Sequence, residues 1–261
     1  MFCSLLASLR TALFYLLMVP WTIACSLFAM VALYLLPYRH RHAICVRIWA
    51  QVSVFLCRVI CGVRWQVEGE EHIPSQPCVL ASNHQSAWET IFFQTRFSPQ
   101  STVVKRELLF IPFFGWALKR LSSISIDRGD QRIALQQLIC QGTEHVRKGA
   151  WVLIFPEGTR QKWPNLGKIR RGAATLAKKS KAPLLPVVHT AGYCWAADRW
   201  TIKPGLVVVR FGPALLSTQK TTYEINTELE SWLKANLSDL VKSDLRQDKE
   251  TAERTVQNRC L

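Results

Sequence analysis

The sequence predicts an α/β fold with a mostly parallel sheet flanked by helices, preceded by an N-terminal membrane-embedded helical segment. Residues 11–36 form an apolar run without a single charge. Beyond residue 63, short apolar runs alternate with amphipathic helical stretches, which is typical of a sheet covered on both faces. We therefore expect membrane-anchoring helices in 1–63, an α/β domain in 64–241 and a charged, flexible tail in 242–261.

The composition narrows the class of partner. Lys and Arg number 33 against 18 Asp and Glu, giving a formal net charge of +15, while 49% of the residues are hydrophobic. Such a balance favours nucleic acid, phospholipid head groups or a phosphorylated substrate. No basic run is interleaved with stacking aromatics, so no nucleic acid is expected as a partner. The nine cysteines are scattered through apolar runs, which predicts a reducing compartment, no disulfide framework and no metal site.

The first apolar run, 11–36, is longer than the roughly 20 residues that cross a bilayer. It is too long for a cleaved signal peptide and lacks a clear small-residue cleavage site. Pro20 lies in the middle of the run and allows two structures, a kinked helix or a re-entrant helical hairpin. The flanking charges, Arg10 before the run and Arg41 after it, do not decide its orientation.

A second apolar stretch covers residues 43–63. Arg47, Gln51 and Arg58 fall close to one helical stripe, and almost all other positions are apolar. This pattern favours a helix lying in the membrane interface. The alternative is a core helix whose two arginines extend their charged ends to solvent.

The α/β part should contain strands separated by helices. The expected strands are 65–69, 78–82, 101–105, 123–127, 151–155, 184–188 and 206–212. The expected helices are 87–94, 132–148, 172–181 and 221–241. In sheets of this kind, reactive groups gather in the loops beyond the carboxyl ends of the strands.

A histidine and a glutamate follow the expected strand 78–82. His84 lies in the turn after that strand, and Glu89 lies in the first turn of the next helix. Folded back over the carboxylate, the imidazole would keep one ring nitrogen protonated and leave the other free to accept a proton. The spacing therefore fits a general base, although an isolated H-x4-E more often reflects helix capping.

Cations end three of the expected strands. The apolar strand 151–155 breaks into the sequence PEGTR at 156–160, where glycine permits a tight turn and Arg160 supplies donors for an oxyanion. Lys105 ends another strand, and Arg128 follows a third. A phosphate would satisfy these cations, which favours a phosphorylated ligand over a plain surface turn.

Four blocks in this order resemble those of the glycerophospholipid acyltransferases, specifically the bacterial lysophosphatidic acid acyltransferases (1-acyl-sn-glycerol-3-phosphate acyltransferases). They are HQSAWE at 84–89, SSISIDRGD at 122–130, FPEGTR at 155–160 and LLPVV at 184–188. Each block is weak alone, but their order and spacing behind a membrane segment are specific. Glu89 stands where the family more often has the shorter aspartate.

The resemblance implies that His84 and Glu89 are catalytic. His84 would take the proton from an acceptor hydroxyl as its oxygen attacks an acyl thioester, with Glu89 orienting the ring. General-base help of this kind is typically worth about 10²–10⁴-fold. The implied substrate-binding residues are Lys105, Arg128, Glu157, Gly158, Thr159 and Arg160. The three cations among them would hold the acceptor's phosphate, and Glu157 and Gly158 would shape the pocket.

The implied reaction moves an acyl chain from acyl-CoA or acyl carrier protein to the sn-2 hydroxyl of lysophosphatidic acid, giving phosphatidic acid in phospholipid biosynthesis. No cofactor is implied beyond the thioester co-substrate. The implied location is the bacterial inner (cytoplasmic) membrane, in contact with the phospholipid bilayer and with the active site facing the cytoplasm. Two alternatives stay open: acylation of another acceptor, such as glycerol 3-phosphate, another lysophospholipid or an ornithine-type lipid, and a non-catalytic lipid-binding membrane protein.

Two further features have less specific interpretations. His189, just after the fourth block, is expected to be a core or loop histidine. The basic segment 161–172 is expected to close over substrate, to contact anionic lipid or to remain a solvated loop.

Overall fold

A seven-stranded sheet forms the centre of the computed structural model, which describes residues 2–121, 123–127 and 129–257. Its strand order is β1-β7-β6-β2-β5-β3-β4. The strands are β1 (Val63–Glu68), β2 (Val79–Ser82), β3 (Gln100–Lys105), β4 (Ile124–Ile126), β5 (Trp151–Ile154), β6 (Leu184–His189) and β7 (Gly205–Phe211). Neighbours run parallel except β6 and β7, which pair antiparallel. The predicted α/β fold with a mostly parallel sheet is confirmed.

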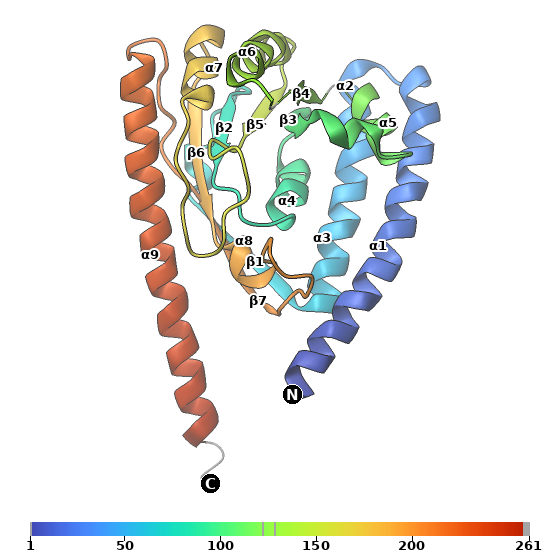
Figure 1. Ribbon diagram of the computed structural model, residues 1–261, viewed down its shortest axis with the longest axis vertical. Coiled ribbons are helices and arrows are strands. Elements are labelled where there is room, and N and C mark those ends of the chain that lie inside the picture. Colours follow the sequence, from blue (N-terminus) through green and yellow to red (C-terminus); the bar gives the residue numbers. More distant parts are fainter. Residues whose placement is uncertain (1, 122, 128, 258–261) are drawn as a thin grey trace.

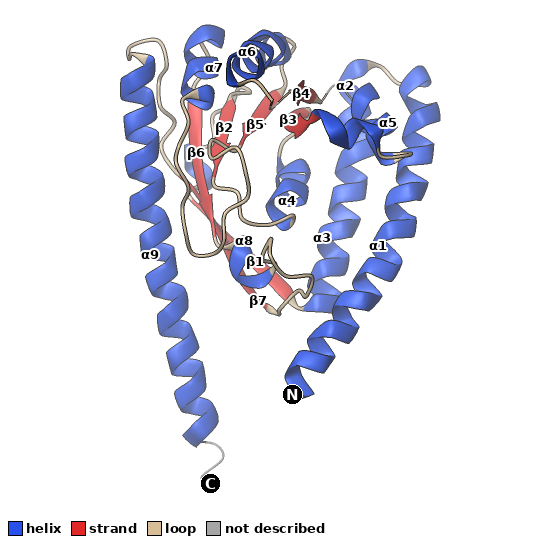
Figure 2. Cartoon of the chain, viewed as in Figure 1, coloured by secondary structure: helices blue, strands red, loops and turns tan. Residues whose placement is uncertain are grey.

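Helices cover both faces of this sheet (Figures 1 and 2). One face carries α1 (Phe2–Leu35), α3 (Ile48–Cys61), α4 (Trp88–Arg96) and α8 (Ala191–Cys194), and the other carries α6 (Gln131–Arg147), α7 (Gly172–Ser180) and α9 (Thr222–Gln257). Two short helices, α2 (Tyr38–His42) and α5 (Phe114–Arg120), lie near the end of α1. Along β2, Leu80 packs into the first core while Val79 and Ala81 pack into the second, because strand side chains alternate between faces.

The first apolar run forms one unbroken helix, α1, that continues through Pro20. The re-entrant hairpin within this run is therefore wrong, and the chain reverses direction only after Leu35 (Figure 1). An uninterrupted helix satisfies its backbone hydrogen bonds internally, whereas a turn in the middle of an apolar run would leave polar groups uncovered. By length and composition, Leu5–Leu35 and His40–Cys61 could each cross a membrane.

The second apolar stretch begins as a π-helical turn, Ala43–Arg47, and continues as α3. One face of α3 is buried in the core through Ala50, Val54, Cys57 and Cys61, while Ile48, Phe55 and Val59 are exposed. The core interpretation is therefore correct for one face of α3, and the other face is apolar and exposed; its placement in a membrane interface stays a prediction. The guanidinium carbon of Arg58 lies 5.4 Å from the centre of the Trp65 ring, which keeps this charge at the end of the helix.

The N-terminal helices share a core with the α/β body. Phe14 of α1 is fully buried, and its ring meets that of Trp195 edge-on at a centroid distance of 5.5 Å. The Thr11 hydroxyl oxygen accepts a hydrogen bond of 2.9 Å from the Ile202 backbone N–H. The change in composition at residue 63 is therefore not a boundary in packing, because the helices before it and the α/β part after it share one hydrophobic core.

The C-terminal helix α9 is longer than expected. Helical backbone continues to Gln257, so the described part of the expected flexible tail, 242–257, extends α9 instead of fraying at Val241. Glutamate, lysine and arginine have good helix propensity, which accounts for the continuation. Residues 258–261 lie outside the described residues. The C-terminal half of α9 extends beyond the body of the molecule (Figure 1).

Candidate active site

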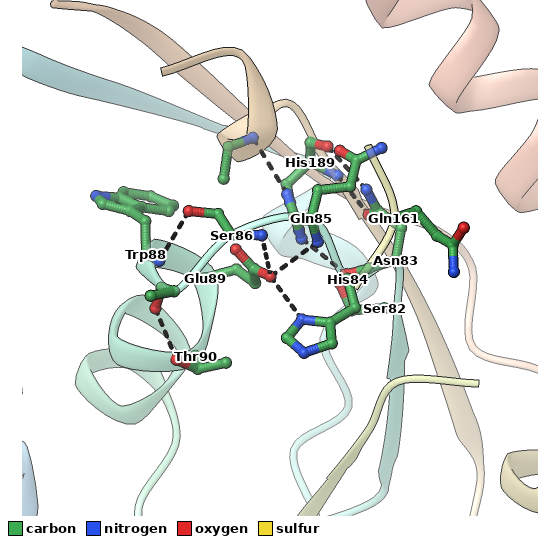
Figure 3. A network of polar contacts seen from close by, with 12 residues as sticks. Ser82, Asn83, His84, Gln85, Ser86, Trp88, Glu89, Thr90, Gln161 and His189 are labelled. Carbon is green, nitrogen blue, oxygen red and sulfur yellow. Dashed lines mark hydrogen bonds and ion pairs between the residues drawn. The ribbon is translucent and has the colours of Figure 1, made fainter. Parts of the chain in front are cut away.

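The turn between β2 and α4 brings His84 and Glu89 together. β2 ends at Ser82 and α4 begins at Trp88, so the chain folds back and directs the imidazole onto the first turn of the helix (Figure 3). His84 Nδ1 lies 2.8 Å from Glu89 Oε1. The predicted contact between the two side chains is confirmed.

Glu89 Oε1 is held by three N–H groups. Besides the imidazole, the backbone N–H groups of Gln85 and Ser86 donate to it at 3.1 and 2.9 Å. Burial alone would raise the pKa of this carboxyl, but the His189 and His84 imidazoles and the backbone donors outweigh it and hold the pKa below its ordinary value. An ionised Glu89 requires the proton on Nδ1, which leaves the lone pair on His84 Nε2.

The second ring nitrogen of His84 faces a large cavity. No hydrogen bond to Nε2 occurs within the described part of the chain, and the side chain is 15% exposed. One face of the imidazole stacks on Phe155 at a centroid distance of 4.0 Å and an interplanar angle of 14°. The cavity that His84 lines has a volume of about 1630 Å³. The ring is thus fixed on two sides and open on the third.

The cavity has chemically different walls. Towards α1, α3 and α5 it is largely apolar, with Cys25, Ala29, Trp49, Leu118 and Leu121 among its lining residues. Towards α7 and α9 it is basic, with Arg160, Lys168, Arg170 and Arg171. His84 and the residues that follow β5 line the same cavity. One cavity therefore offers surfaces for both an alkyl chain and anionic groups.

The PEGTR segment forms the tight turn that its glycine predicted. Gly158 has φ +78° and its N–H donates to the Phe155 carbonyl at 3.0 Å. A φ in this region favours glycine. Gly158, Thr159 and Arg160 line the cavity, and Thr159 and Arg160 are solvent-exposed. Their position is compatible with contact to a ligand beside His84.

Glu157 faces away from the cavity. Its Oε2 accepts from the His84 backbone N–H at 2.9 Å, and its Oε1 accepts from the Gly167 N–H at 3.2 Å. The residue is 4% exposed, and burial raises its pKa to about 7. Because both of its carboxylate oxygens accept from backbone N–H groups, Glu157 does not present its side chain to a ligand in the cavity. What the side chain does is hold the backbone of the His84 turn, and so shapes the pocket from behind.

The basic segment after this turn is fastened to the same peptide. The Gln161 N–H donates to the His84 carbonyl at 2.7 Å, and the Gln85 side-chain amide donates to the Asn165 carbonyl at 2.9 Å. Two contacts thus tie the segment directly to the loop that carries the histidine, and the Gly167 bond to Glu157 adds an indirect one, since Glu157 also accepts from the His84 N–H. Nothing in the sequence indicated that Glu157, Gln85 and Gln161 hold these segments together, because each forms its hydrogen bond with a backbone group that is distant in sequence.

His189 is part of the framework, as expected for a core histidine. It is fully buried, its Nε2 lies 2.8 Å from the Asn83 carbonyl, and the Ala191 N–H donates to its Nδ1 at 3.2 Å. Nδ1 is therefore an acceptor and Nε2 carries the proton; burial also lowers the pKa of His189.

The other two predicted phosphate ligands are Lys105 and Arg128. Lys105 is the last residue of β3, as predicted. Arg128 lies outside the described residues. Of the three predicted cations, Arg160 is therefore the one whose side chain can be placed at the cavity.

Known proteins share this arrangement of sequence and fold. A family model described as Acyltransferase matches residues 64–190. A 1-acyl-sn-glycerol-3-phosphate acyltransferase of Pseudomonas aeruginosa is 42% identical over 240 residues, covering 91% of this chain and 93% of that protein. The chain belongs to the 1-acyl-sn-glycerol-3-phosphate acyltransferase family. It is accordingly an acyltransferase, and the resemblance drawn from the four sequence blocks is confirmed.

More distant members of the family extend the comparison. The chloroplastic 1-acyl-sn-glycerol-3-phosphate acyltransferase BAT2 of Brassica napus is 33% identical over 58% of this chain and 43% of that protein. The crystal structure of the 1-acyl-sn-glycerophosphate (LPA) acyltransferase PlsC from Thermotoga maritima superimposes with a TM-score of 0.75 at 21% identity, covering 89% of this chain and 95% of that one. The structural match shows that the two chains share their fold over most of their length.

Proposed function

We propose that this acyltransferase moves an acyl chain from acyl-CoA or acyl carrier protein to the sn-2 hydroxyl of lysophosphatidic acid, making phosphatidic acid for phospholipid biosynthesis. The observation that carries the proposal is the opening of the His84–Glu89 pair onto a cavity that Arg160 also lines. A base, a phosphate-binding cation and an apolar wall are the three features that this reaction needs. The names of the curated relatives support the choice of acceptor.

The chemistry requires no covalent enzyme intermediate. The acceptor hydroxyl oxygen attacks the thioester carbonyl carbon while its proton passes to His84 Nε2, and Glu89 stabilises the imidazolium that forms. The tetrahedral intermediate then collapses: the carbon–sulfur bond breaks, and the leaving thiolate takes the proton from the imidazolium. The products are an ester and a free thiol, and the base returns to its starting state.

Arg160 would position the acceptor by its phosphate. A guanidinium can bind a phosphate through two parallel hydrogen bonds, which fixes both distance and orientation. Lys105 and Arg128 are proposed to share this role. Holding the glycerol phosphate beside the imidazole converts the attack into a reaction between pre-positioned groups, and this is where the binding energy favours catalysis.

The proposed location is the cytoplasmic face of a bacterial inner membrane. Leu9, Leu16, Val31 and Tyr34 are among the exposed apolar side chains of α1, and α3 exposes others. Such a surface is suited to lipid. A lysophospholipid would reach the cavity from the bilayer and the thioester from water.

The test is an acceptor-by-donor activity matrix on the purified full chain, read by mass spectrometry of the product. Lysophosphatidic acid, glycerol 3-phosphate, another lysophospholipid and an ornithine-type lipid are each offered with acyl-CoA and with acyl carrier protein. We expect phosphatidic acid from lysophosphatidic acid to dominate. Faster acylation of any other acceptor would show that the substrate is wrong.

His84→Ala decides between an enzyme using this base and a lipid-binding protein using the same cavity. Its matched control is His145→Ala, which removes a histidine that contacts Ser101 at 2.9 Å and does not line the cavity. We expect His84→Ala to lose about 10²–10⁴-fold in kcat and the control to keep its activity. Transfer by His84→Ala at the rate of the parent would remove the imidazole from the mechanism.

A further inference from the structure

The basic wall of the cavity extends well beyond Arg160. Lys168, Arg170 and Arg171 are exposed, and all three line the cavity. None of them forms an ion pair with a carboxylate in the described part of the chain. By contrast Glu230, an acid in the lining, is already paired with Lys234. This wall therefore presents to a ligand in the cavity positive charge that no carboxylate of the described residues neutralises.

The backbone of the segment that carries these cations is tied to the catalytic turn. The Arg170 N–H donates to the Pro156 carbonyl at 2.9 Å, and its Nε lies 3.5 Å from where a Cβ on Gly158 would stand. The bonds that fasten the segment to His84 and Gln85 hold the rest of it. These backbone bonds argue against both a freely solvated loop and a segment that moves to close over substrate.

The segment leads into an environment suited to a nucleotide. Arg171 precedes α7, whose first turn has no side-chain cap, so its backbone N–H groups add partial positive charge. The guanidinium carbon of Arg171 lies 5.6 Å from the ring centre of Tyr223, which is 63% exposed and lines the cavity. Asn226, 8% exposed in the same wall, has no hydrogen-bond partner for Oδ1 among the described residues.

We propose that Lys168, Arg170 and Arg171 bind the phosphate groups of the coenzyme A moiety of the acyl donor, with Tyr223 offering a stacking face for its adenine. This proposal rests on the proposed function, since it concerns the donor of the same reaction. The acceptor carries a single phosphate, which Arg160 can hold beside His84. Coenzyme A carries a diphosphate and a 3′-phosphate, so a row of cations further along the wall matches its charge.

The position of the basic wall favours this ligand over the membrane surface. α7 and α9 cover the face of the sheet opposite α1 and α3, so these cations lie on the side away from the exposed apolar helices (Figure 1). The concave lining with an exposed aromatic ring suits a nucleotide better than the convex surface of a folded carrier protein. The acyl chain would extend from the thioester at His84 towards the apolar wall.

The test compares Michaelis constants for two thioester donors that share an acyl chain, palmitoyl-CoA and palmitoyl-pantetheine. The variants are Arg171→Gln and the double variant Arg170→Gln/Arg171→Gln, in the full chain. The matched control is Lys162→Gln in the same segment, whose amine pairs with Asp198 at 3.4 Å and does not line the cavity. All substituted side chains are exposed, so folding should be unaffected.

We expect the KM for palmitoyl-CoA to rise about three- to tenfold in Arg171→Gln, as for the loss of one exposed charge-assisted contact, and further in the double variant. The KM for palmitoyl-pantetheine, the KM for lysophosphatidic acid and all constants of Lys162→Gln should stay at parental values.

Three outcomes would overturn the donor site: an unchanged KM for palmitoyl-CoA, an equal rise for both thioesters, or a rise confined to lysophosphatidic acid. Reduced binding to anionic phosphatidylglycerol vesicles with unchanged kinetics would assign the cations to lipid and likewise overturn it. If the parent enzyme makes no phosphatidic acid from palmitoyl-CoA, the proposed function itself fails, which is a separate result.

Discussion

Replacing Glu89 by glutamine should separate the charge of this side chain from its hydrogen bonds. In the parent, Oε1 accepts all three N–H bonds, while Oε2 is buried without a partner in the described structure. A glutamine can place its amide oxygen at the Oε1 position and keep the same three donors. Its NH₂ group then occupies the place of an atom that had no partner, so the His84 tautomer and the turn are retained.

The expected loss is therefore electrostatic. Two unit charges about 4 Å apart interact by about 4 kcal/mol at an effective dielectric constant of about 20. The contact between His84 Nδ1 and Glu89 Oε1 is closer, at 2.8 Å, but the neutral amide oxygen still stabilises the imidazolium in part. We expect kcat to fall by about 10²–10³-fold, because about 1.4 kcal/mol corresponds to each factor of ten.

The assay is kcat with lysophosphatidic acid and palmitoyl-CoA, together with the melting temperature of the purified variant. Glu89→Ala is the comparison, since it removes both the charge and the acceptor and should lower stability as well as activity. A Glu89→Gln enzyme with the parental kcat would refute the charge argument. A variant whose melting temperature falls as far as that of Glu89→Ala would refute the claim that the hydrogen bonds are retained.

Four further predictions concern Glu157, Arg160 and Gly142. Glu157→Gln, unlike Glu89→Gln, sets an amide NH₂ against one of two backbone N–H donors, so we expect stability to fall by about 1–3 kcal/mol in denaturant titration; no change would contradict the role of this carboxyl. Burial raises the pKa of Glu157 from 4.5 to about 7, so its contribution to the free energy of unfolding is full below pH 4.5 and is lost as the pH rises through 7. This contribution amounts to about 3 kcal/mol. The pH dependence of the free energy of unfolding should therefore be smaller in Glu157→Gln. Arg160→Gln should raise the KM for lysophosphatidic acid about tenfold without raising that for palmitoyl-CoA, and an unchanged acceptor KM would exclude Arg160 from phosphate binding. Gly142→Ala would place a methyl group 2.7 Å from Leu176 Cδ2 between α6 and α7; because Leu176 is fully buried, we expect a loss of about 1–3 kcal/mol with normal kcat, and an unchanged melting temperature would mean that the interface can relax.

Much of the fold was predictable because the local pattern and the global architecture agree. Central strands such as β2 and β5 are short, fully buried apolar runs, and each strand expected from the sequence is present within a few residues. The antiparallel pairing of β6 with β7 was not predictable, since strand direction depends on the path of the connecting chain. Pro20 was a misleading signal for a hairpin, because packing against α3 maintains the helix through it.

The candidate site was predictable to the extent that its residues are adjacent in sequence. His84 and Glu89 are five positions apart, and the expected strand–turn–helix brings them into contact. Glu157 was expected to shape the pocket, but how it does so was not predictable. Its actual partners are backbone N–H groups, which every residue except proline carries, so no side-chain pattern could reveal them.

The burial of Phe14 beside Trp195 has a practical consequence for anyone seeking a water-soluble form of the enzyme. Deleting the first two long helices would strip one side of the catalytic body and leave Trp195 and its apolar neighbours facing solvent. Aggregation, and not a soluble catalyst, should be the product of that truncation. Solubility would have to be engineered by polar replacements at outward positions such as Leu16 and Val31, with the helices themselves left in place.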